Sequence, residues 1–295
     1  MRAIIIGAGI GGLTAALTLR RAGIAVEVFE QATALREIGA GIQISPNASR
    51  ILLRLGLGEA LRRAGVRPLA TQVRRWNSGE LLGRHPLADH CERVFGAPYY
   101  HFHRAELLDL LAVALPSGVL HLDHRLVALA QHPGGVEAEF HNRARAEADV
   151  VIGADGIHST TRELIMGKES PRFSGHVAYR GLVPAERVAH LGIETSAYSW
   201  WGPEHHFVHY FVGAGARYLN WVAAAPGEWR LESWTAKGEL SDALAEFDGW
   251  HSQIGEIIRA SDFTNRWALY DRDPLPQWSA GRVTLLGDAA HAMLP

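Results

Sequence analysis

Apolar and polar positions follow two different periods along the first 31 residues. Residues 3–6 are apolar in succession, as in a buried strand, and apolar side chains then recur at helical spacing from Leu13 to Leu19. Gly23 is placed to end that helix, and residues 26–29 form a second apolar run. The pattern therefore predicts a strand–helix–strand unit at the start of the chain.

The rest of the chain continues with short helical and extended patterns. Helices are predicted over residues 48–55 with Asn47 as N-cap, 104–115 before Pro116, a segment through Arg162, 241–247 and 254–260. Strands are predicted as a strand–turn–strand within 71–95, three runs within 118–141, and single strands at 150–153, 177–182, 198–201, 206–212, 217–223 and 283–286.

These patterns predict an α/β protein with an interrupted organisation. The strand–acid–turn elements at 150–156 and 283–288 begin with apolar runs like that of the first strand. We therefore expect them to share its sheet. We predict a Rossmann-like domain interleaved with a second, β-rich domain. The first is assigned residues 1–70, 98–174 and 276–295, and the second residues 71–97 and 175–275.

Composition excludes several classes of protein. The net charge of -2 gives no reason to expect nucleic acid or an anionic membrane surface as a partner. No apolar run reaches the roughly 18 residues of a membrane-spanning helix. The single cysteine, Cys91, excludes an internal disulfide and fits a reducing cytoplasm. The 16 histidines are scattered without a metal-binding spacing, so no metal site is expected.

The glycines after the first strand carry the first chemical signal. Gly7, Gly9 and Gly12 have G-x-G-x-x-G spacing. In a nucleotide-binding turn the first glycine permits the tight bend, the second lets backbone amides approach a pyrophosphate, and the third lets the helix pack closely on the sheet. Glu30, after the second strand, can accept hydrogen bonds from a ribose diol. The alternative is a glycine-rich turn without a ligand.

Acidic residues follow two further strands. Ligands of open α/β sheets bind beyond the carboxyl ends of the strands, so we expect Glu30, Asp155 and Asp288 to converge. Asp155 before Gly156 is also a common turn pair. Arg104 has a similar alternative as an exposed arginine at the start of a helix.

Five segments together carry a family resemblance. They are LREIGAGI at 35–42, HRAEL at 103–107, DGIHSTTR at 155–162, WALYDRDPL at 267–275 and GDAAH at 287–291. With the glycine motif, they resemble the group A flavin-dependent aromatic hydroxylases, whose type fold is that of p-hydroxybenzoate hydroxylase. Within that family the chain resembles in particular salicylate 1-hydroxylase and 3-hydroxybenzoate 6-hydroxylase.

The resemblance implies an activity and its cofactors. FAD is reduced by NAD(P)H, reacts with O2 to give a peroxide at the flavin 4a carbon, and hydroxylates a small phenolic aromatic acid. NAD(P)H binds in this family without a second glycine motif, and the chain has only one. From the single cysteine we expect a cytoplasmic enzyme, and a homodimer is one expectation for its assembly.

The resemblance further assigns roles to the residues of the cofactor site. Glu30 is expected to hold the adenosine ribose, and Arg36 and Arg104 to lie along the flavin phosphate and ribityl chain. Asp288 is expected to bind the ribityl hydroxyls, and Asp155 to place the pyrophosphate and the nicotinamide cofactor. Arginine suits a phosphate because its planar fork provides directed donors.

A base near the ring hydroxyl would assist the reaction, because a phenol is more nucleophilic without its proton. His206 and Tyr210 point to the same side of a strand over 206–210, and members of the family carry a His and a Tyr at this spacing in the substrate site. We predict His206 as the base or phenol partner and Tyr210 as a second partner. The alternative is that Tyr210 packs within the sheet while the histidines at 205, 206 and 209 are solvated. Gln43 and Arg180 are weaker candidates for the same pocket.

The comparison with the family also concerns the end of the chain. Family members continue beyond the position of Pro295 with a segment that lies against the flavin ring. We therefore expect the C-terminal part of the fold to be missing and FAD to be held weakly by residues 1–295. Three alternatives remain at this point: a flavin oxidoreductase of the same fold with other chemistry, a nicotinamide dehydrogenase, and a non-catalytic fragment.

Overall fold

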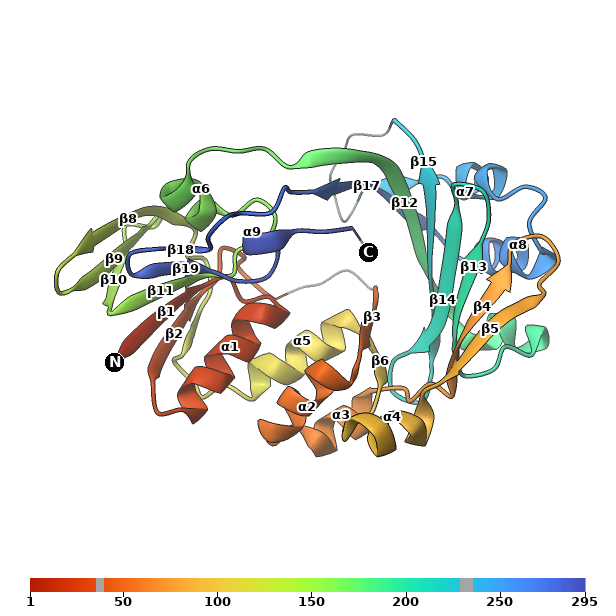
Figure 1. The fold of residues 1–295 in the computed structure, drawn as a ribbon, viewed down its shortest axis with the longest axis horizontal. Helices are drawn as coiled ribbons and strands as arrows, with labels where there is room; N and C mark the ends of the chain where they lie inside the picture. The colour runs from red at the N-terminus through yellow and green to blue at the C-terminus, as the bar shows by residue number, and fades with distance from the viewer. Residues whose placement is uncertain (36–39, 229–235, 295) are drawn as a thin grey trace. The chain divides into compact units, whose positions relative to one another are not determined.

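The computed structural model describes residues 1–35, 40–228 and 236–294. The chain divides into two compact units (Figure 1). Unit 1 consists of Met1–Arg36, Leu108–Arg172 and Tyr270–Pro295, and unit 2 of Glu37–Leu107 and Phe173–Leu269. The predicted domains differ from these units mainly at residues 40–70 and 98–107, whose contacts place them in unit 2. That the first domain binds FAD and the second binds the substrate stays a prediction.

Unit 1 is built on a six-stranded sheet with the order β18-β19-β11-β1-β2-β7. These strands are β1 (Arg2–Ile6), β2 (Ala25–Phe29), β7 (Leu120–His121), β11 (Val150–Gly153), β18 (Ser279–Ala280) and β19 (Val283–Leu285). β1 pairs in parallel with both β2 and β11, and β11 pairs in parallel with β19. The carboxyl ends of these four strands therefore form one row along a single edge of the sheet, as the sequence predicted.

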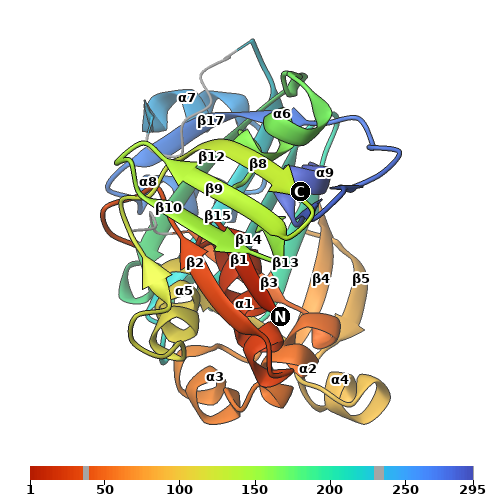
Figure 2. The ribbon, with the colours of Figure 1, turned by 90° about the vertical axis from the view of Figure 1, so that its left-hand side faces the viewer.

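Helical and extended layers cover this sheet. Helix α1 (Ile10–Arg21) lies against β1 and β2. A three-stranded sheet of β8 (Leu126–His132), β9 (Gly135–Phe140) and β10 (Arg145–Ala148) lies across the strands in Figure 2. Ile4 and Ile6 share a buried apolar cluster with residues of this small sheet. Because side chains alternate along a strand, consecutive residues of β1 serve different layers.

Unit 2 is built on an eight-stranded sheet with the order β16-β17-β12-β15-β14-β13-β4-β5. Its strands are β4 (Ala70–Arg75), β5 (Leu81–Pro86), β12 (Arg172–Pro184), β13 (Ala197–Trp201), β14 (His206–Val212), β15 (Tyr218–Pro226), β16 (Lys237–Gly238) and β17 (Thr264–Asp271). Helices α7 (Leu240–Glu246) and α8 (Ser252–Arg259) cover one face. The core on that face includes Trp200, Phe207, Trp221 and Ile257. The other face is the one that carries the candidate substrate residues.

A two-stranded ribbon and several helices complete the fold. The ribbon pairs β3 (Gly41–Ile44) with β6 (Tyr100–His103). The helices are α2 (Pro46–Arg54), α3 (Gly58–Ala64), α4 (Ala88–Phe95), α5 (Arg104–Val113), α6 (Thr160–Met166), the 3-10 helix η1 (Ala185–Leu191) and α9 (Asp288–His291). Among the described residues, the longest helices are too short or too polar to cross a membrane.

Most predicted elements are confirmed, but the region after β3 required three corrections. Helix α2 begins at Pro46 with Ser45 at the N-cap position, so the prediction of Asn47 as N-cap was wrong. Proline suits the first turn of a helix because its φ is fixed near the helical value. Helices α3 and α4 were missed, and α4 lies within a segment predicted as strand and turn. Each spans about two turns, which is too short for a clear periodic pattern.

Candidate functional site

The glycine turn between β1 and α1 depends on close backbone approach. Gly7 has φ +103°, and a Cβ there would lie 2.4 Å from the carbonyl oxygen of Ala154. A Cβ at Gly12 would lie 2.0 Å from the carbonyl oxygen of Gly7. Gly9 differs, because a Cβ there would meet no described atom within 4 Å. Gly7 and Gly12 therefore permit the close backbone packing of the turn, and Gly9 leaves open space beside it.

Glu30 lies at the end of β2 and is bonded to this turn. Its Oε2 accepts a hydrogen bond from the backbone nitrogen of Ala8 at 2.8 Å, and its Oε1 accepts one from Ala32 at 2.9 Å. A carboxylate has about four acceptor positions, so capacity remains for a hydroxyl donor. The predicted contact with a ribose stays a prediction.

Asp155 organises the turn that precedes α6. Its Oδ1 accepts from the hydroxyl of Ser159 at 2.5 Å, and its Oδ2 accepts from the backbone nitrogen and hydroxyl of Thr161 at 2.9 and 3.0 Å. Ser159 in turn caps α6 by accepting from the backbone nitrogen of Arg162. Both carboxylate oxygens are thus engaged locally, which favours the turn interpretation of Asp155. Its contact with a cofactor stays a prediction.

Asp288 occupies the corresponding position after β19. It is exposed at the first position of α9 and follows Gly287, whose φ is +64°. β2, β11 and β19 end along the same edge, with β1 between β2 and β11, so Glu30, Asp155 and Asp288 follow strand ends of one row. The predicted convergence of these three acids on one ligand stays a prediction.

Arg162 joins the turns around Asp155 and Asp288, a role that sequence reasoning did not assign. Its side chain is buried, and Nη1 donates to the carbonyl oxygens of Ala289 and Ala290 at 3.3 and 3.2 Å. Its Nη2 pairs with Glu169. The DGIHSTTR segment contained this arginine, but only the fold shows which carbonyl groups it reaches.

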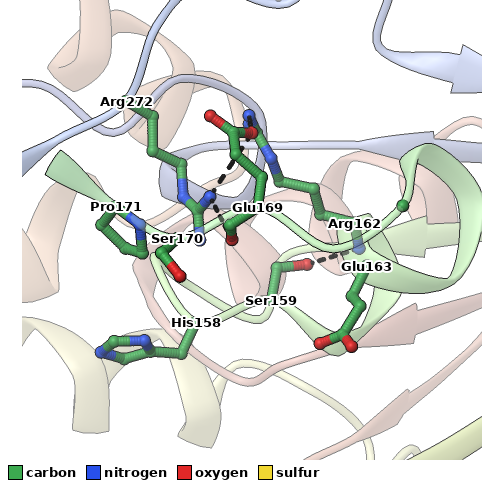
Figure 3. A pocket seen from close by; sticks show the side chains of 9 residues that line it. His158, Ser159, Arg162, Glu163, Glu169, Ser170, Pro171 and Arg272 are labelled. Carbon is green, nitrogen blue, oxygen red and sulfur yellow. Dashed lines mark hydrogen bonds and ion pairs between the residues drawn. The ribbon is translucent and has the colours of Figure 1, made fainter.

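A polar pocket of about 200 Å³ opens beside Arg162 (Figure 3). Arg272 donates to the carbonyl oxygens of Ile157 at 2.6 Å and Glu169 at 3.1 Å, and Glu169 lies between the two guanidinium groups. The ring of His158 points away from these three side chains in Figure 3. The pocket is lined by His158, Ser159, Arg162, Glu163, Gly167, Glu169, Ser170, Pro171 and Arg272.

Of the two predicted phosphate-binding arginines, the structure describes only Arg104. Arg36 lies outside the described residues. Arg104 is the first residue of α5, is partly buried, and donates its backbone N–H to the carbonyl oxygen of Ala40 at 2.8 Å. The predicted contact of both arginines with a flavin stays a prediction.

The predicted alternation of side chains along β14 is confirmed. Phe207 belongs to the core beneath α7 and α8, and His209 is buried with its ring stacked on Tyr198 at 4.6 Å. Tyr210 belongs instead to a separate cluster that includes Val208. His206 is therefore on the Tyr210 side of the strand, and it is exposed. The alternative of solvated histidines is wrong for His209, whereas the exposure of His206 agrees with it.

His206 and Tyr210 have pKa shifts in opposite directions. Partial desolvation of the His206 ring lowers its pKa, and the neighbouring His176 and His205 lower it further. Burial raises the pKa of Tyr210, and nearby Tyr99 adds to this effect. At neutral pH, His206 is thus a neutral proton acceptor and Tyr210 a protonated donor.

The β3–β6 ribbon packs on the sheet at Tyr210. The backbone nitrogen of Gly41 donates to Asn220 Oδ1 at 2.7 Å, and Asn220 pairs directly with Tyr210 across the sheet. A Cβ at Gly41 would lie 2.7 Å from Tyr210 Cε2, so glycine permits this approach. The ring centroid of His101 lies 4.5 Å from that of Tyr210.

The two weaker candidates lie in this same part of unit 2. Gln43 Oε1 accepts a hydrogen bond from the hydroxyl of Tyr99 at 2.7 Å. Arg180 is buried and its guanidinium lies 4.7 Å from the centre of the Trp267 ring, a cation–π arrangement. Sequence reasoning missed Tyr99, His101 and Asn220, because no spacing in the sequence links them to β14.

Metal-binding residue types do not gather in this site. Within residues 1–35, 40–228 and 236–294, no three His, Cys, Asp or Glu side chains are grouped to hold a metal ion. The polar groups of the two sites are backbone amides, carboxylates, a histidine and phenols. These groups suit an organic cofactor and an organic substrate.

Comparison with known proteins agrees with this description of the sites. The family model described as "FAD binding domain" matches residues 1–295. A 3-amino-4-hydroxybenzoate 2-monooxygenase of Streptomyces platensis is 45% identical over 295 residues, which are 100% of this chain and 74% of that protein. A 3-hydroxybenzoate 6-hydroxylase of Aquipseudomonas alcaligenes is 37% identical over 297 residues, covering 99% of this chain and 74% of the relative.

A solved structure shows the same fold. The crystal structure of Klebsiella pneumoniae HpxO complexed with FAD and uric acid has a TM-score of 0.87 and 30% identity, and the match covers 100% of this chain and 74% of that one. The chain belongs to the FAD binding domain family, among the flavoprotein aromatic hydroxylases. The resemblance and the cofactor class predicted from the sequence are confirmed.

Proposed function

We propose that the protein uses FAD, NAD(P)H and O2 to hydroxylate a small phenolic aromatic acid of the hydroxybenzoate or salicylate type. The observation that carries this proposal is the placement of His206 and Tyr210 on the same side of β14, where desolvation favours the neutral imidazole as a proton acceptor and the neutral phenol as a hydrogen-bond donor. The names of the relatives support the substrate class, since both act on a hydroxybenzoate.

The described residues of unit 1 fit FAD. Among them, no side chain caps the N-terminus of α1, and the space beside Gly9 is open. Backbone amides at such a helix start favour a pyrophosphate. Glu30 would hold the adenosine ribose and Asp288 the ribityl hydroxyls. The supporting role of Asp155 in unit 1 stays a prediction, as do those of Arg104, which belongs to unit 2, and of Arg36, which lies outside the described residues.

Residues of unit 2 would remove the proton from the ring hydroxyl of the substrate and stabilise the phenolate. When bound and reduced by NAD(P)H, FAD supplies the chemistry that activates oxygen. An imidazole nitrogen of His206 would accept the proton of the ring hydroxyl, because the neutral form of this histidine is favoured. The Tyr210 hydroxyl would donate a hydrogen bond to the resulting phenolate oxygen. Together they increase the electron density of the ring that is hydroxylated.

The remaining parts of the proposal concern partners and location. NAD(P)H is the co-substrate typical of the family. Assays with NADH and with NADPH would show which of the two the protein uses. The single cysteine supports a cytoplasmic location. A homodimer is also proposed, and sedimentation of the full-length protein would test it.

The test is a substrate panel with the full-length protein. Hydroxybenzoates, aminohydroxybenzoates and hydroxypyridine carboxylates would be compared for stimulated NADH or NADPH oxidation and for a product that gains one oxygen atom. His206→Gln is expected to lower kcat/KM by about 100-fold, the range of general base catalysis. His205→Gln is the matched control, because the neighbouring His205 lies near Glu246. Failure to oxygenate any member of the panel would reject the proposal.

A further inference from the structure

The hydroxyl of Tyr99 determines which end of the Gln43 amide is free. Tyr99 donates to Gln43 Oε1 at 2.7 Å. An amide has an acceptor oxygen at one end and a donor nitrogen at the other. Once the oxygen is engaged by Tyr99, the nitrogen end is the one available to the remaining neighbours of Gln43.

Gln43 is held close to Tyr210 by the β3–β6 ribbon. It pairs directly with His101, whose ring centroid lies 4.5 Å from that of Tyr210. Two residues earlier, the backbone nitrogen of Gly41 donates to Asn220, and a Cβ at Gly41 would lie 2.7 Å from Tyr210. The side chain of Gln43 lowers the pKa of the Tyr210 phenol, against the larger effect of burial. This direction is the one expected when an amide N–H faces the phenol oxygen.

We propose that Tyr99 is a positioning residue that acts through Gln43 to direct the Tyr210 hydroxyl proton toward the substrate. With the amide nitrogen facing it, the Tyr210 oxygen has a donor on that side and turns its own O–H away. With the amide reversed, Tyr210 would donate to Gln43 and be lost as a donor to the substrate. This inference rests on the proposed function, because it requires a phenolic substrate at Tyr210.

The ring of Tyr99 also has a packing role that the test must separate from its hydroxyl. It lies edge-on to His101, with 5.8 Å between the ring centroids. Tyr99→Phe keeps this ring and removes only the donor. Tyr100→Phe is the matched control, because Tyr100 is the next residue and its ring packs with Phe102 at 5.5 Å.

The experiment measures the pH dependence of substrate binding and kcat/KM in the full-length protein, with 3-hydroxybenzoate and 3-amino-4-hydroxybenzoate as probes. Tyr99→Phe is expected to raise the phenol pKa of the bound substrate by about one unit and to lower kcat/KM about tenfold at pH 7. The loss should diminish at high pH, where the phenol ionises without help. Tyr100→Phe should match the wild type.

Two further variants test the path through Gln43. The double variant Tyr99→Phe/Tyr210→Phe should behave as Tyr210→Phe alone, because Tyr99 acts only through Tyr210. Gln43→Glu retains an acceptor for Tyr99 but presents a second acceptor to Tyr210, so it should reproduce the Tyr99→Phe loss.

The outcomes distinguish the two proposals. An active wild type with an unaffected Tyr99→Phe variant, or independent losses in the double variant, would overturn the positioning role alone. A wild type that neither binds nor oxygenates either probe or the wider panel would remove the proposed function and this inference together.

Discussion

The side-chain carboxylate of Glu30 accepts a hydrogen bond from the backbone nitrogen of Ala8, with 2.8 Å between Oε2 and N. The acid after β2 and the glycine turn after β1 therefore form one connected unit, although 22 positions separate them in the sequence. A ligand bound at this turn would meet a carboxylate whose position is already fixed.

Removal of this carboxylate should weaken cofactor binding. Glu30→Ala removes an acceptor of two backbone N–H groups and the proposed ribose contact. The dissociation constant for FAD should rise about 10- to 100-fold, since hydrogen bonds to charged groups contribute about 1.5–3 kcal/mol. Flavin fluorescence titration of the full-length protein would measure it. Glu27→Ala is the control, because Glu27 lies on the same strand and its carboxylate pairs with the ring of His121 at 3.1 Å. Equal affinities in the two variants would contradict the prediction.

Substitutions at two glycines of the turn should affect different properties, Gly12→Ala the stability of the fold and Gly9→Ala the affinity for FAD. Gly12→Ala places a methyl group 2.0 Å from a backbone oxygen and should destabilise the fold by about 1–3 kcal/mol. Gly9→Ala meets no described atom and has an ordinary φ of -71°, so it should cost less than about 1 kcal/mol. It should nevertheless weaken FAD binding at least tenfold, because the methyl group fills the proposed pyrophosphate space. Urea unfolding and FAD titration of both variants check this; strong FAD binding by Gly9→Ala would be inconsistent with the site.

Arg162 should matter more for stability than an exposed arginine. Arg162→Met leaves the Ala289 and Ala290 carbonyl groups without this donor and should cost about 2 kcal/mol. Arg145→Met is the control, because Arg145 is exposed and its ion pairs lie on the surface of a strand. It should change the free energy of unfolding by less than about 1 kcal/mol. Denaturant unfolding followed by circular dichroism would measure both, and similar costs would argue against a linking role for Arg162.

Two buried histidines should make the protein sensitive to acid. Burial lowers the pKa of His101 and of His209 to about 3 each, from about 6.5 in an unfolded chain. Between pH 6.5 and 3 the unfolded chain binds protons that the folded chain does not. Stability is therefore greatest above pH 6.5 and falls as the pH decreases, by up to about 1.4 kcal/mol per pH unit for each histidine.

A single substitution should isolate one of these contributions. Trp200 Nε1 donates to His209 Nε2 at 3.0 Å, and His209→Gln keeps an acceptor there without a titrating ring. This variant should lose about half of the acid sensitivity attributed to the pair, measured by urea unfolding between pH 7.5 and 4.5. The control is His190→Gln, whose side chain is 63% exposed. An unchanged pH slope in His209→Gln would refute the assignment.

Local patterns in the sequence were sufficient for the main elements and for a nucleotide-binding turn, and the family resemblance then implied FAD as the cofactor. Alternation along 206–212 placed His206 and Tyr210 on one side of β14, because side-chain direction in a strand has a period of two. The glycine spacing identified the turn after β1 for a similar reason, since missing Cβ atoms are visible in the sequence itself. Parallel pairing of strands that end in acids then placed Glu30, Asp155 and Asp288 along one edge.

Tertiary structure alone decided how those residues are used. Contacts between Tyr99 and Gln43, or between Arg162 and Ala290, join segments 56 and 128 positions apart, and no periodicity encodes such pairs. The orientation of a hydrogen-bonding group depends on all its neighbours at once, as the three hydrogen bonds accepted by Asp155 illustrate. The sequence by itself determined the strand ends, the glycine turn and the side of β14; the packing of distant segments determined partners, burial and protonation.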